Sequence, residues 1–471
     1  MSSDKIYKLG IKNIFYSVFA QGIVFVTSIV IGFVLPKFLG VEQFGYWQVY
    51  LFYSGYVMFF SLGFNDGLYL RYGGLDYNQL PFKMLRSTMR IFIGVLFVFT
   101  VIFFMVSFLE KDYSKVCAFG ATSINILLVG INGTLLTILQ FTNRIKLNSF
   151  LTILNKIIFV FLIVPLFFIN WVDFRLVIAA DLFTKFILLG LNIHKSLGLF
   201  AGKTERLKDG FAEYLQNIIV GNKLMIANIL SSLIIGIGRF IVERFMSIET
   251  YSLYSFATTI TLFFLVFITA SSLSLYPLLS RIDSEKLPNL YTNINKVLTT
   301  ILFLALAGYF PLFYLIKLYL PEYMDVFNYL NILFVIVFAQ GKMIFLVNTY
   351  YKVLREEKAM LIANITGFVV AVIIVIPTFY FTRSILGIVI GTTIALLWRC
   401  YASEIYLKKK MGIGNYINMI VENIIIIIFI ISFWNGISVL GILIYMTTVL
   451  SYTFFNKKII YQYINKIFKL F

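Results

Sequence analysis

The stretch LPKFLGVEQFGYW, Leu35–Trp47, connects two long apolar segments of the chain. Pro36 is expected to end the first helix, and the two glycines of the stretch allow the chain to reverse within a few residues. Phe44 and Trp47 are expected to anchor this corner at the outer membrane interface, where aromatic side chains gather. The stretch therefore predicts a corner between two membrane helices.

A weaker copy of this connector, VERFMSIETYSLY, occurs at Val242–Tyr254. Each copy lies between the first two members of a set of six apolar segments. In both sets the fifth segment carries an early asparagine, Asn155 or Asn364, and the connector before it is polar. The repeat predicts two six-helix halves of like orientation, a plan in which transporters place the substrate site between halves and work by alternating access.

The composition predicts an integral membrane protein. Hydrophobic residues make up 60% of the 471 positions and charged residues 13%, which is more apolar surface than a soluble core can bury. The net charge of +18 would suggest nucleic-acid binding in a soluble protein. Here the basic residues concentrate in alternate connectors, as in cytoplasmic membrane loops, so no nucleic-acid partner is expected. With two cysteines far apart and one histidine, neither a disulfide framework nor a His-based metal site is expected.

Apolar segments of roughly twenty residues, the length that crosses a bilayer, predict an all-α protein with about fourteen transmembrane helices. The predicted spans are 13–35, 45–68, 88–109, 116–140, 149–170, 175–198, 216–240, 250–279, 295–319, 325–350, 359–381, 384–406, 418–436 and 438–455. The alternation of basic and weakly charged connectors places both termini in the cytoplasm, which requires an even number of spans.

The segments predict five regions along the chain. These are an N-terminal six-helix lobe at 1–200, a cytoplasmic linker at 201–215, a C-terminal six-helix lobe at 216–410, an additional helix pair at 411–456, and a basic amphipathic tail at 457–471. The tail is expected to lie on the inner leaflet, because its apolar and basic residues occupy opposite helical faces.

The stretch VLPKFLGVEQFGYWQVY, followed one helix later by SLGFNDGLYLRYGG at Ser61–Gly74, resembles the opening of the Wzx polysaccharide flippases. These belong to a superfamily that includes multidrug-and-toxin extruders and peptidoglycan-precursor flippases. The resemblance covers about the first 410 residues in layout and roughly 13–75 in motif. It implies a pseudo-symmetric fold like that of the extruders.

The resemblance further implies movement of an undecaprenyl-diphosphate-linked oligosaccharide from the inner to the outer leaflet of a bacterial cytoplasmic membrane. The product would be O-antigen, capsule or a related glycan. Polysaccharide polymerase and glycosyltransferases of the same pathway are the implied partners besides the lipid-linked oligosaccharide and membrane lipids. No cofactor is expected, although coupling to H⁺ or Na⁺ is implied.

Charged side chains inside apolar spans cost about 2.5–3.5 kcal/mol each and usually face a protein interior or an aqueous cavity. We therefore expect a set of cations to bind the diphosphate or acidic sugars of the substrate. They are Arg71, Lys156, Lys185, Arg239, Lys342 and Arg399. Arg71 is expected near the inner surface, where a lipid diphosphate would first dock.

Structural roles for the same residues remain open. Lys185 follows Asp181 by one helical turn, and Arg239 precedes Glu243 by one turn, so both could form self-neutralising pairs. Lys156 and Arg399 could extend to the cytoplasmic edge of the membrane. Arg71 could serve only to fix topology. Lys342 has no acidic neighbour in its own helix.

Asp181 is the candidate residue for cation coupling, because it is the one carboxylate predicted to lie well inside a span. A pairing with Lys185 would oppose its protonation. An enzyme is not expected, because all external connectors are short, whereas a membrane polymerase or glycosyltransferase usually needs a long external loop with acid–base residues. A small-molecule exporter of the same superfamily is the main alternative to a flippase.

Overall fold

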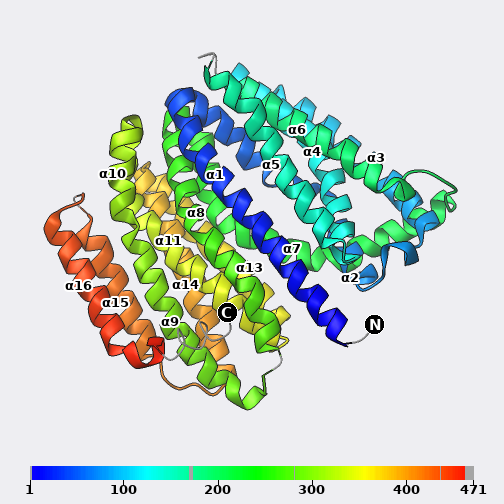
Figure 1. Cartoon of the computed structure of the whole chain (residues 1–471). Coiled ribbons are helices and arrows are strands. Elements are labelled where there is room, and N and C mark those ends of the chain that lie inside the picture. Colours follow the sequence, from blue (N-terminus) through cyan, green and yellow to red (C-terminus); the bar gives the residue numbers. More distant parts are fainter. Residues whose placement is uncertain (1–2, 169–172, 281, 435, 462–471) are drawn as a thin grey trace. The chain divides into compact units, whose positions relative to one another are not determined.

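The computed structural model describes residues 3–168, 173–280, 282–434 and 436–461, and these residues form helices and connecting turns without a strand (Figure 1). Ten of the helical stretches are long and apolar enough to cross a membrane. The all-α, multi-pass membrane class expected from the sequence is therefore confirmed. The chain divides into two compact units, Met1–Ile229 (unit 1) and Leu230–Phe471 (unit 2).

Unit 1 begins with α1, Ser3–Ser54, which contains two helical segments joined at Gly40. The backbone of Gly40 has φ 70° and ψ 175°, a conformation that glycine adopts without the steric penalty of a Cβ. Pro36 lies inside the helical run, so the prediction that proline ends the first helix is wrong. The glycine makes the break.

Polar contacts fix this corner to two other helices of unit 1. Tyr46 donates a hydrogen bond of 2.7 Å to Asp112, which also caps α4, Tyr113–Phe141. The side-chain oxygen of Gln43 accepts a hydrogen bond from the backbone N–H of Phe174, at the start of α6, Phe174–Lys195. Gln43 thus satisfies a backbone N–H at the start of α6 that would otherwise lack a partner, and Tyr46 holds the side chain that caps α4.

Phe44 and Trp47 are buried, so the prediction that they anchor the corner at the membrane interface is wrong. Trp47 packs in parallel against Phe159 of α5, Ile145–Phe168, with ring centroids 6.0 Å apart. Aromatic side chains bury a large area each and pack favourably against one another, which stabilises this helix crossing.

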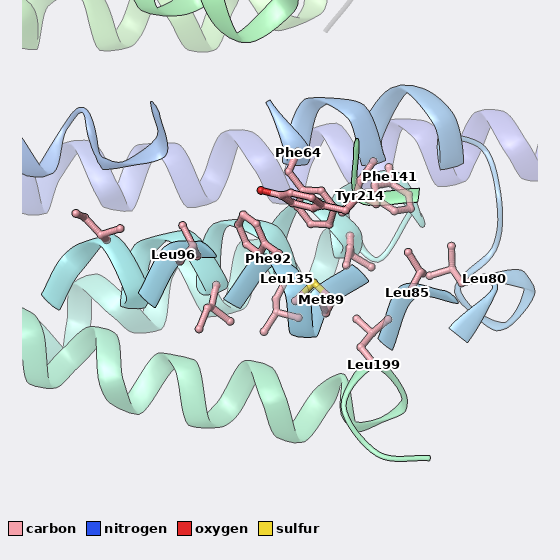
Figure 2. Close-up of a cluster of buried hydrophobic side chains, with 14 of the residues drawn as sticks. Phe64, Leu80, Leu85, Met89, Phe92, Leu96, Leu135, Phe141, Leu199 and Tyr214 are labelled. Carbon is pink, nitrogen blue, oxygen red and sulfur yellow. The ribbon is translucent and has the colours of Figure 1, made fainter. Parts of the chain in front are cut away.

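The predicted span 45–68 is a series of three pieces. They are the end of α1, the 3₁₀ turn η1 at Val57–Ser61, and α2 at Phe64–Tyr72. Leu62 and Gly63 between them have positive φ. The core of this region contains Phe64, Met89 and Phe92 among its buried side chains (Figure 2).

Helix α3, Phe82–Ser107, supports the connection between α6 and α7, Leu207–Phe245. The predicted linker 201–215 is non-helical only up to residue 206, because α7 has begun by Leu207. Arg86 of α3 donates hydrogen bonds of 2.8 Å to the carbonyls of Gly198 and Lys203, and Ser87 donates one to the carbonyl of Glu205. The linker is therefore fastened to α3.

Unit 2 contains the end of α7 and the helices that follow it. The second copy of the corner lies between α7 and α8. The other elements are α8 (Ile248–Leu279), α9 (Leu287–Ala307), α10 (Tyr309–Tyr319), α11 (Leu330–Lys342), α12 (Asn348–Val353), α13 (Glu357–Thr382), α14 (Ile385–Lys410), α15 (Ile417–Ser432) and α16 (Val439–Phe455).

Helix α11 is the centre of unit 2, because every one of its 13 residues is buried. A π-helical turn, Met343–Val347, directly follows Lys342 and joins α11 to α12. Helices α15 and α16 occupy the predicted terminal pair but have only 16 and 17 residues. Most of the predicted amphipathic tail, residues 462–471, lies outside the described residues.

Candidate functional site

In unit 1, Lys185 and Asp181 of α6 form an ion pair with 2.5 Å between Nζ and Oδ2. The buried Tyr50 hydroxyl donates a 2.5 Å hydrogen bond to the same carboxylate oxygen. Asn125 of α4 accepts a hydrogen bond from Lys185 and donates one to the oxygen of Tyr50. Both charged side chains are 16% exposed. The self-neutralising pair is therefore present, and it is fixed by α1 and α4.

Lys156 of α5 is partly buried and forms no ion pair with the described residues of unit 1. Its positive charge therefore remains a candidate for substrate contact. Its role, like that of Asp181 in coupling, stays a prediction.

Arg71 at the end of α2 makes a two-pronged ion pair with Glu213 of α7, with Nη–Oε distances of 2.6 and 3.1 Å. Tyr72 donates a further hydrogen bond to Glu213, and Arg71 donates one to Asn217. Burial raises the pKa of Tyr72, and its hydrogen bond to the carboxylate adds to the increase. Arg71 is thus paired rather than a free cation.

Glycines bring α2 and α7 into backbone contact beside this ion pair. A Cβ added to Gly67 would lie 1.9 Å from the carbonyl oxygen of Asn217. A Cβ on Gly221 would lie 2.0 Å from the carbonyl oxygen of Gly63. Gly63 and Gly67 therefore allow a close approach of two helices, with α7 as the partner.

In unit 2, Arg239 of α7 is partly buried, one turn before the buried Glu243. Tyr251 of α8 is a neighbour of both. The predicted contact of Arg239 with the substrate is not tested by this arrangement.

Lys342 lies between two carboxylates that come from other helices. Its Nζ is 2.5 Å from Oε2 of Glu404 on α14 and 2.6 Å from Oε2 of Glu422 on α15. All three side chains have 0% exposure. Lys408, one turn after Glu404, pairs with its other oxygen at 2.9 Å. The absence of an acidic neighbour in its own helix does not leave Lys342 unpaired.

The carboxylate of Glu422 also accepts a 3.0 Å hydrogen bond from Thr299 of α9. We call Lys342, Glu404, Lys408 and Glu422 the charge network. The expectation that Asp181 is the one carboxylate well inside a predicted span is wrong, because Glu422 is fully buried within the apolar segment INMIVENIIIIIFIIS. A search of the last predicted helix pair for isolated acidic residues could have found Glu422 from the sequence.

Arg399 of α14 is 1% exposed, so it does not extend to the membrane edge. Its Nη1 donates hydrogen bonds to Ser231 at 2.8 Å and Asn364 at 3.3 Å, and its Nη2 donates one to Gln340 at 2.8 Å. These partners are neutral, and Arg399 has no ion pair within the described part of unit 2. A charge in such a position costs about 2.5–3.5 kcal/mol on membrane-insertion scales.

The predicted cations thus differ in whether a carboxylate neutralises their charge. Arg71, Lys185 and Lys342 are paired with carboxylates, whereas Arg399 is held by neutral groups. The long apolar helices therefore carry buried ionic groups, and charges within membrane spans usually face a protein interior or an aqueous cavity.

The chain belongs to the family described as polysaccharide biosynthesis protein, because the sequence model of that family matches residues 11–283. This match confirms the family resemblance that the connector and Ser61–Gly74 indicate. A search of curated proteins returned no match.

Solved structures share the fold over most of the chain. One is "Lipid II flippase MurJ, inward closed conformation", with a TM-score of 0.68 and 14% identity over 96% of this chain and 100% of that chain. A multidrug resistance MATE family transporter of the MOP superfamily, in its outward-facing conformation, has a TM-score of 0.55 and 14% identity over 86% of this chain and 96% of that chain.

A third structure is an MOP superfamily transporter from Pyrococcus furiosus, with a TM-score of 0.50 and 12% identity over 85% of this chain and 96% of that chain. The chain therefore shares its fold with these three structures.

Proposed function

We propose that the protein is a flippase that moves an undecaprenyl-diphosphate-linked oligosaccharide from the inner to the outer leaflet of a bacterial cytoplasmic membrane by alternating access. Membership in the polysaccharide biosynthesis family supports the substrate class. The observation that carries the proposal is the likeness to a lipid II flippase over 96% of this chain and the whole of that one.

The main alternative is a small-molecule exporter of the same superfamily. The alignment with the MATE transporter includes 86% of this chain and 96% of the transporter. The alignment with the lipid flippase includes 96% of this chain and 100% of the flippase. The larger shared portion and the higher TM-score favour a lipid-linked substrate. A membrane polymerase is a weaker alternative, because the external connectors predicted from the sequence are short, whereas such an enzyme usually needs a long external loop with acid–base residues.

The proposed topology has fourteen spans, two pseudo-symmetric six-helix halves and a terminal pair, with both termini in the cytoplasm. Glycosyltransferases would supply the substrate at the inner leaflet, and a polymerase of O-antigen, capsule or a related glycan would consume it at the outer leaflet. The transporter catalyses no chemical step in this scheme.

We further propose that the predicted cations contact the anionic headgroup along its route. They are Arg71, Lys156, Lys185, Arg239, Lys342 and Arg399. Arg71, Lys185 and Lys342 are paired with carboxylates in the structure, so their contact with the headgroup requires those pairs to open. Asp181 is the proposed site of H⁺ or Na⁺ coupling, and its release from Lys185 and Tyr50 would be the coupled event.

The test is reconstitution of the full chain into liposomes that carry a fluorescent undecaprenyl-diphosphate-linked oligosaccharide. We expect inner-leaflet label to become accessible to a membrane-impermeant quencher, and faster with an imposed H⁺ or Na⁺ gradient than without one. Uptake of a cationic dye by the same liposomes, without flipping of the labelled lipid, would instead establish the exporter.

A further inference from the structure

We propose that the charge network is a proton-binding site, in which Glu422 takes up one proton and Lys408 leaves the network for water. The inference goes beyond the proposed function, because it holds whichever substrate the protein moves. It concerns a site of unit 2, whereas Asp181 of the proposed coupling lies in unit 1. The ligand is a proton, so the closely packed site needs no cavity to hold it.

The two carboxylates of the charge network differ in how many cations they contact. Glu404 pairs with both lysines, with Lys342 at 2.5 Å and with Lys408 at 2.9 Å. Among the described residues of unit 2, Glu422 pairs with Lys342 alone, at 2.6 Å, and shares this cation with Glu404. An opposite charge nearby favours the ionised form of a carboxyl group, and a like charge disfavours it. A proton that enters the network therefore binds Glu422 rather than Glu404.

A buried amide beside Glu422 has a free hydrogen-bond acceptor. Asn295 of α9 is 1% exposed, and its Nδ2 lies 3.4 Å from Oε1 of Glu422. Its Oδ1 is buried and has no hydrogen-bond partner in the described part of unit 2. A protonated carboxylic acid has one O–H donor, which the ionised form lacks. Half a turn of the Asn295 amide would bring Oδ1 to this donor, so the same side chain can bond either form of Glu422.

The position of Lys408 allows the network to gain a proton without gaining buried charge. Lys408 lies in the last turn of α14, with Nζ 5.5 Å from the ring centroid of Tyr416, which is 38% exposed. When Glu422 is ionised, Lys342 and Lys408 balance the two carboxylates. When Glu422 is protonated, Lys342 balances Glu404 by itself. Lys408 is then the surplus cation, and its long side chain can extend past Tyr416 to water, so the buried groups stay neutral in both arrangements.

Other titratable side chains around the network leave this charge count unchanged. Those that face it are phenols and a thiol, which are neutral at neutral and acidic pH. They are Tyr291 of α9, Cys400 and Tyr401 of α14, and Tyr452 of α16. Acidification therefore acts on the network through its carboxylates.

The test is infrared difference spectroscopy of the purified full chain in nanodiscs, on acidification from neutral pH. A protonated carboxylic acid has a carbonyl band that an ionised carboxylate lacks. We expect the wild type to gain a component of this band that Glu422→Gln lacks. Asn295→Leu keeps all four charges of the network, and we expect it to move this component to higher frequency, because the protonated Glu422 loses a hydrogen bond.

Lys408→Met tests the exchange of the lysine for a proton. Because this variant lacks one cation, a proton must replace it, and we expect the Glu422 component already at neutral pH, where the wild type shows none. Lys408→Arg keeps the charge and should give the wild-type spectrum. Lys286→Met is the matched control, since it removes a lysine from an exposed pair with Asp283, which water keeps ionised. Its spectrum at neutral pH should equal that of the wild type.

A neutral-pH spectrum of Lys408→Met equal to that of the wild type would overturn the proposal, because two buried carboxylates would then share Lys342 without a proton. An acid component that Asn295→Leu leaves unchanged would place the proton on Glu404 and overturn the assignment to Glu422. If Lys408→Met does not fold, the wild type and Asn295→Leu decide, since both carry the full set of charges. The spectra are recorded without substrate, so their outcome is independent of the flipping assay.

Discussion

Lys342, Glu404 and Glu422 carry charges at positions that solvent does not reach. Removing water from each ion costs several kcal/mol, and the short contacts between them offset that cost. Removing one charged side chain leaves an opposite buried charge without a partner. This destabilises the fold more than replacing the whole network with apolar side chains would. The charge network therefore makes each of its members dependent on the others.

We expect Lys342→Met and Glu422→Met each to lower the free energy of unfolding by about 3–5 kcal/mol, because the first leaves Glu422 without a cation and the second leaves Lys342 and Lys408 to share the one carboxylate of Glu404. The double variant should lose less than the sum, because Glu404 and Lys408 can still pair. Unfolding of the purified protein in detergent, followed by intrinsic fluorescence, measures all three. Additive losses in the double variant would contradict the pairing.

Sequence reasoning found Lys342 but not its partners, because Lys342 and Glu422 are 80 positions apart in the chain. Local spacing reports only on neighbours within one helix, such as Asp181 and Lys185. The same limit hid the pairing of Arg71 with Glu213. Which distant helices pack together is decided by tertiary structure, which no local pattern encodes.

Helix positions followed from the sequence much better, because the length of an apolar run sets the length of a membrane helix. Helices α4 and α6 begin and end within about three residues of the predicted ranges 116–140 and 175–198, and α3 begins at Phe82, before the predicted start at 88. The positions at which the helices are interrupted could not be predicted from the sequence. Gly40 rather than Pro36 interrupts α1, and the positive φ values at Leu62 and Gly63 divide the next predicted span.

The contact between α2 and α7 depends on the missing side chain of Gly67. We expect Gly67→Ala to destabilise unit 1 by about 3 kcal/mol or more, because its Cβ would overlap the backbone of Asn217. Gly94→Ala is the control, since a Cβ at Gly94 meets nothing within 4 Å. Thermal unfolding in detergent should show a loss for the first variant and no loss for the second. Equal stability would rule out the close contact.

The linker before α7 should become more accessible to a protease when its hydrogen bonds to α3 are removed. Arg86→Ala breaks the hydrogen bonds to Gly198 and Lys203, so we expect faster cleavage at Glu205 by a glutamate-specific protease. The exposed Arg90 on the same helix provides the control variant Arg90→Ala, which should be cut at the wild-type rate. Identical rates in both variants would show that Arg86 does not hold the linker.

At the scale of the whole molecule, the chain consists of two units that each enclose their own ionic cluster. Unit 1 holds Asp181 with Lys185, and unit 2 holds the charge network. The division at 229/230 lies within α7, whereas the lobe boundary predicted from the sequence is the linker 201–215. The lobes of the predicted repeat therefore remain a prediction.

The predicted fourteen spans place the linker and both termini on the same side of the membrane. Reporter fusions after Lys203 and at the C-terminus should both be active in the cytoplasm, because an even number of helices separates each from the N-terminus. A fusion in the turn at Ser438, between α15 and α16, should report the opposite side. A C-terminal fusion on the external side would exclude the even count.

The π-helical turn Met343–Val347 holds one residue more per hydrogen-bonded ring than an α-helix does. Deleting a single residue there would let α11 and α12 join as one regular helix. Because the wider π turn takes up the surplus residue, α12 would keep nearly the same orientation relative to Lys342. The turn thus accommodates one extra residue between the buried ammonium and the buried Tyr350 and Tyr351 of α12 without moving these tyrosines to another face of the helix.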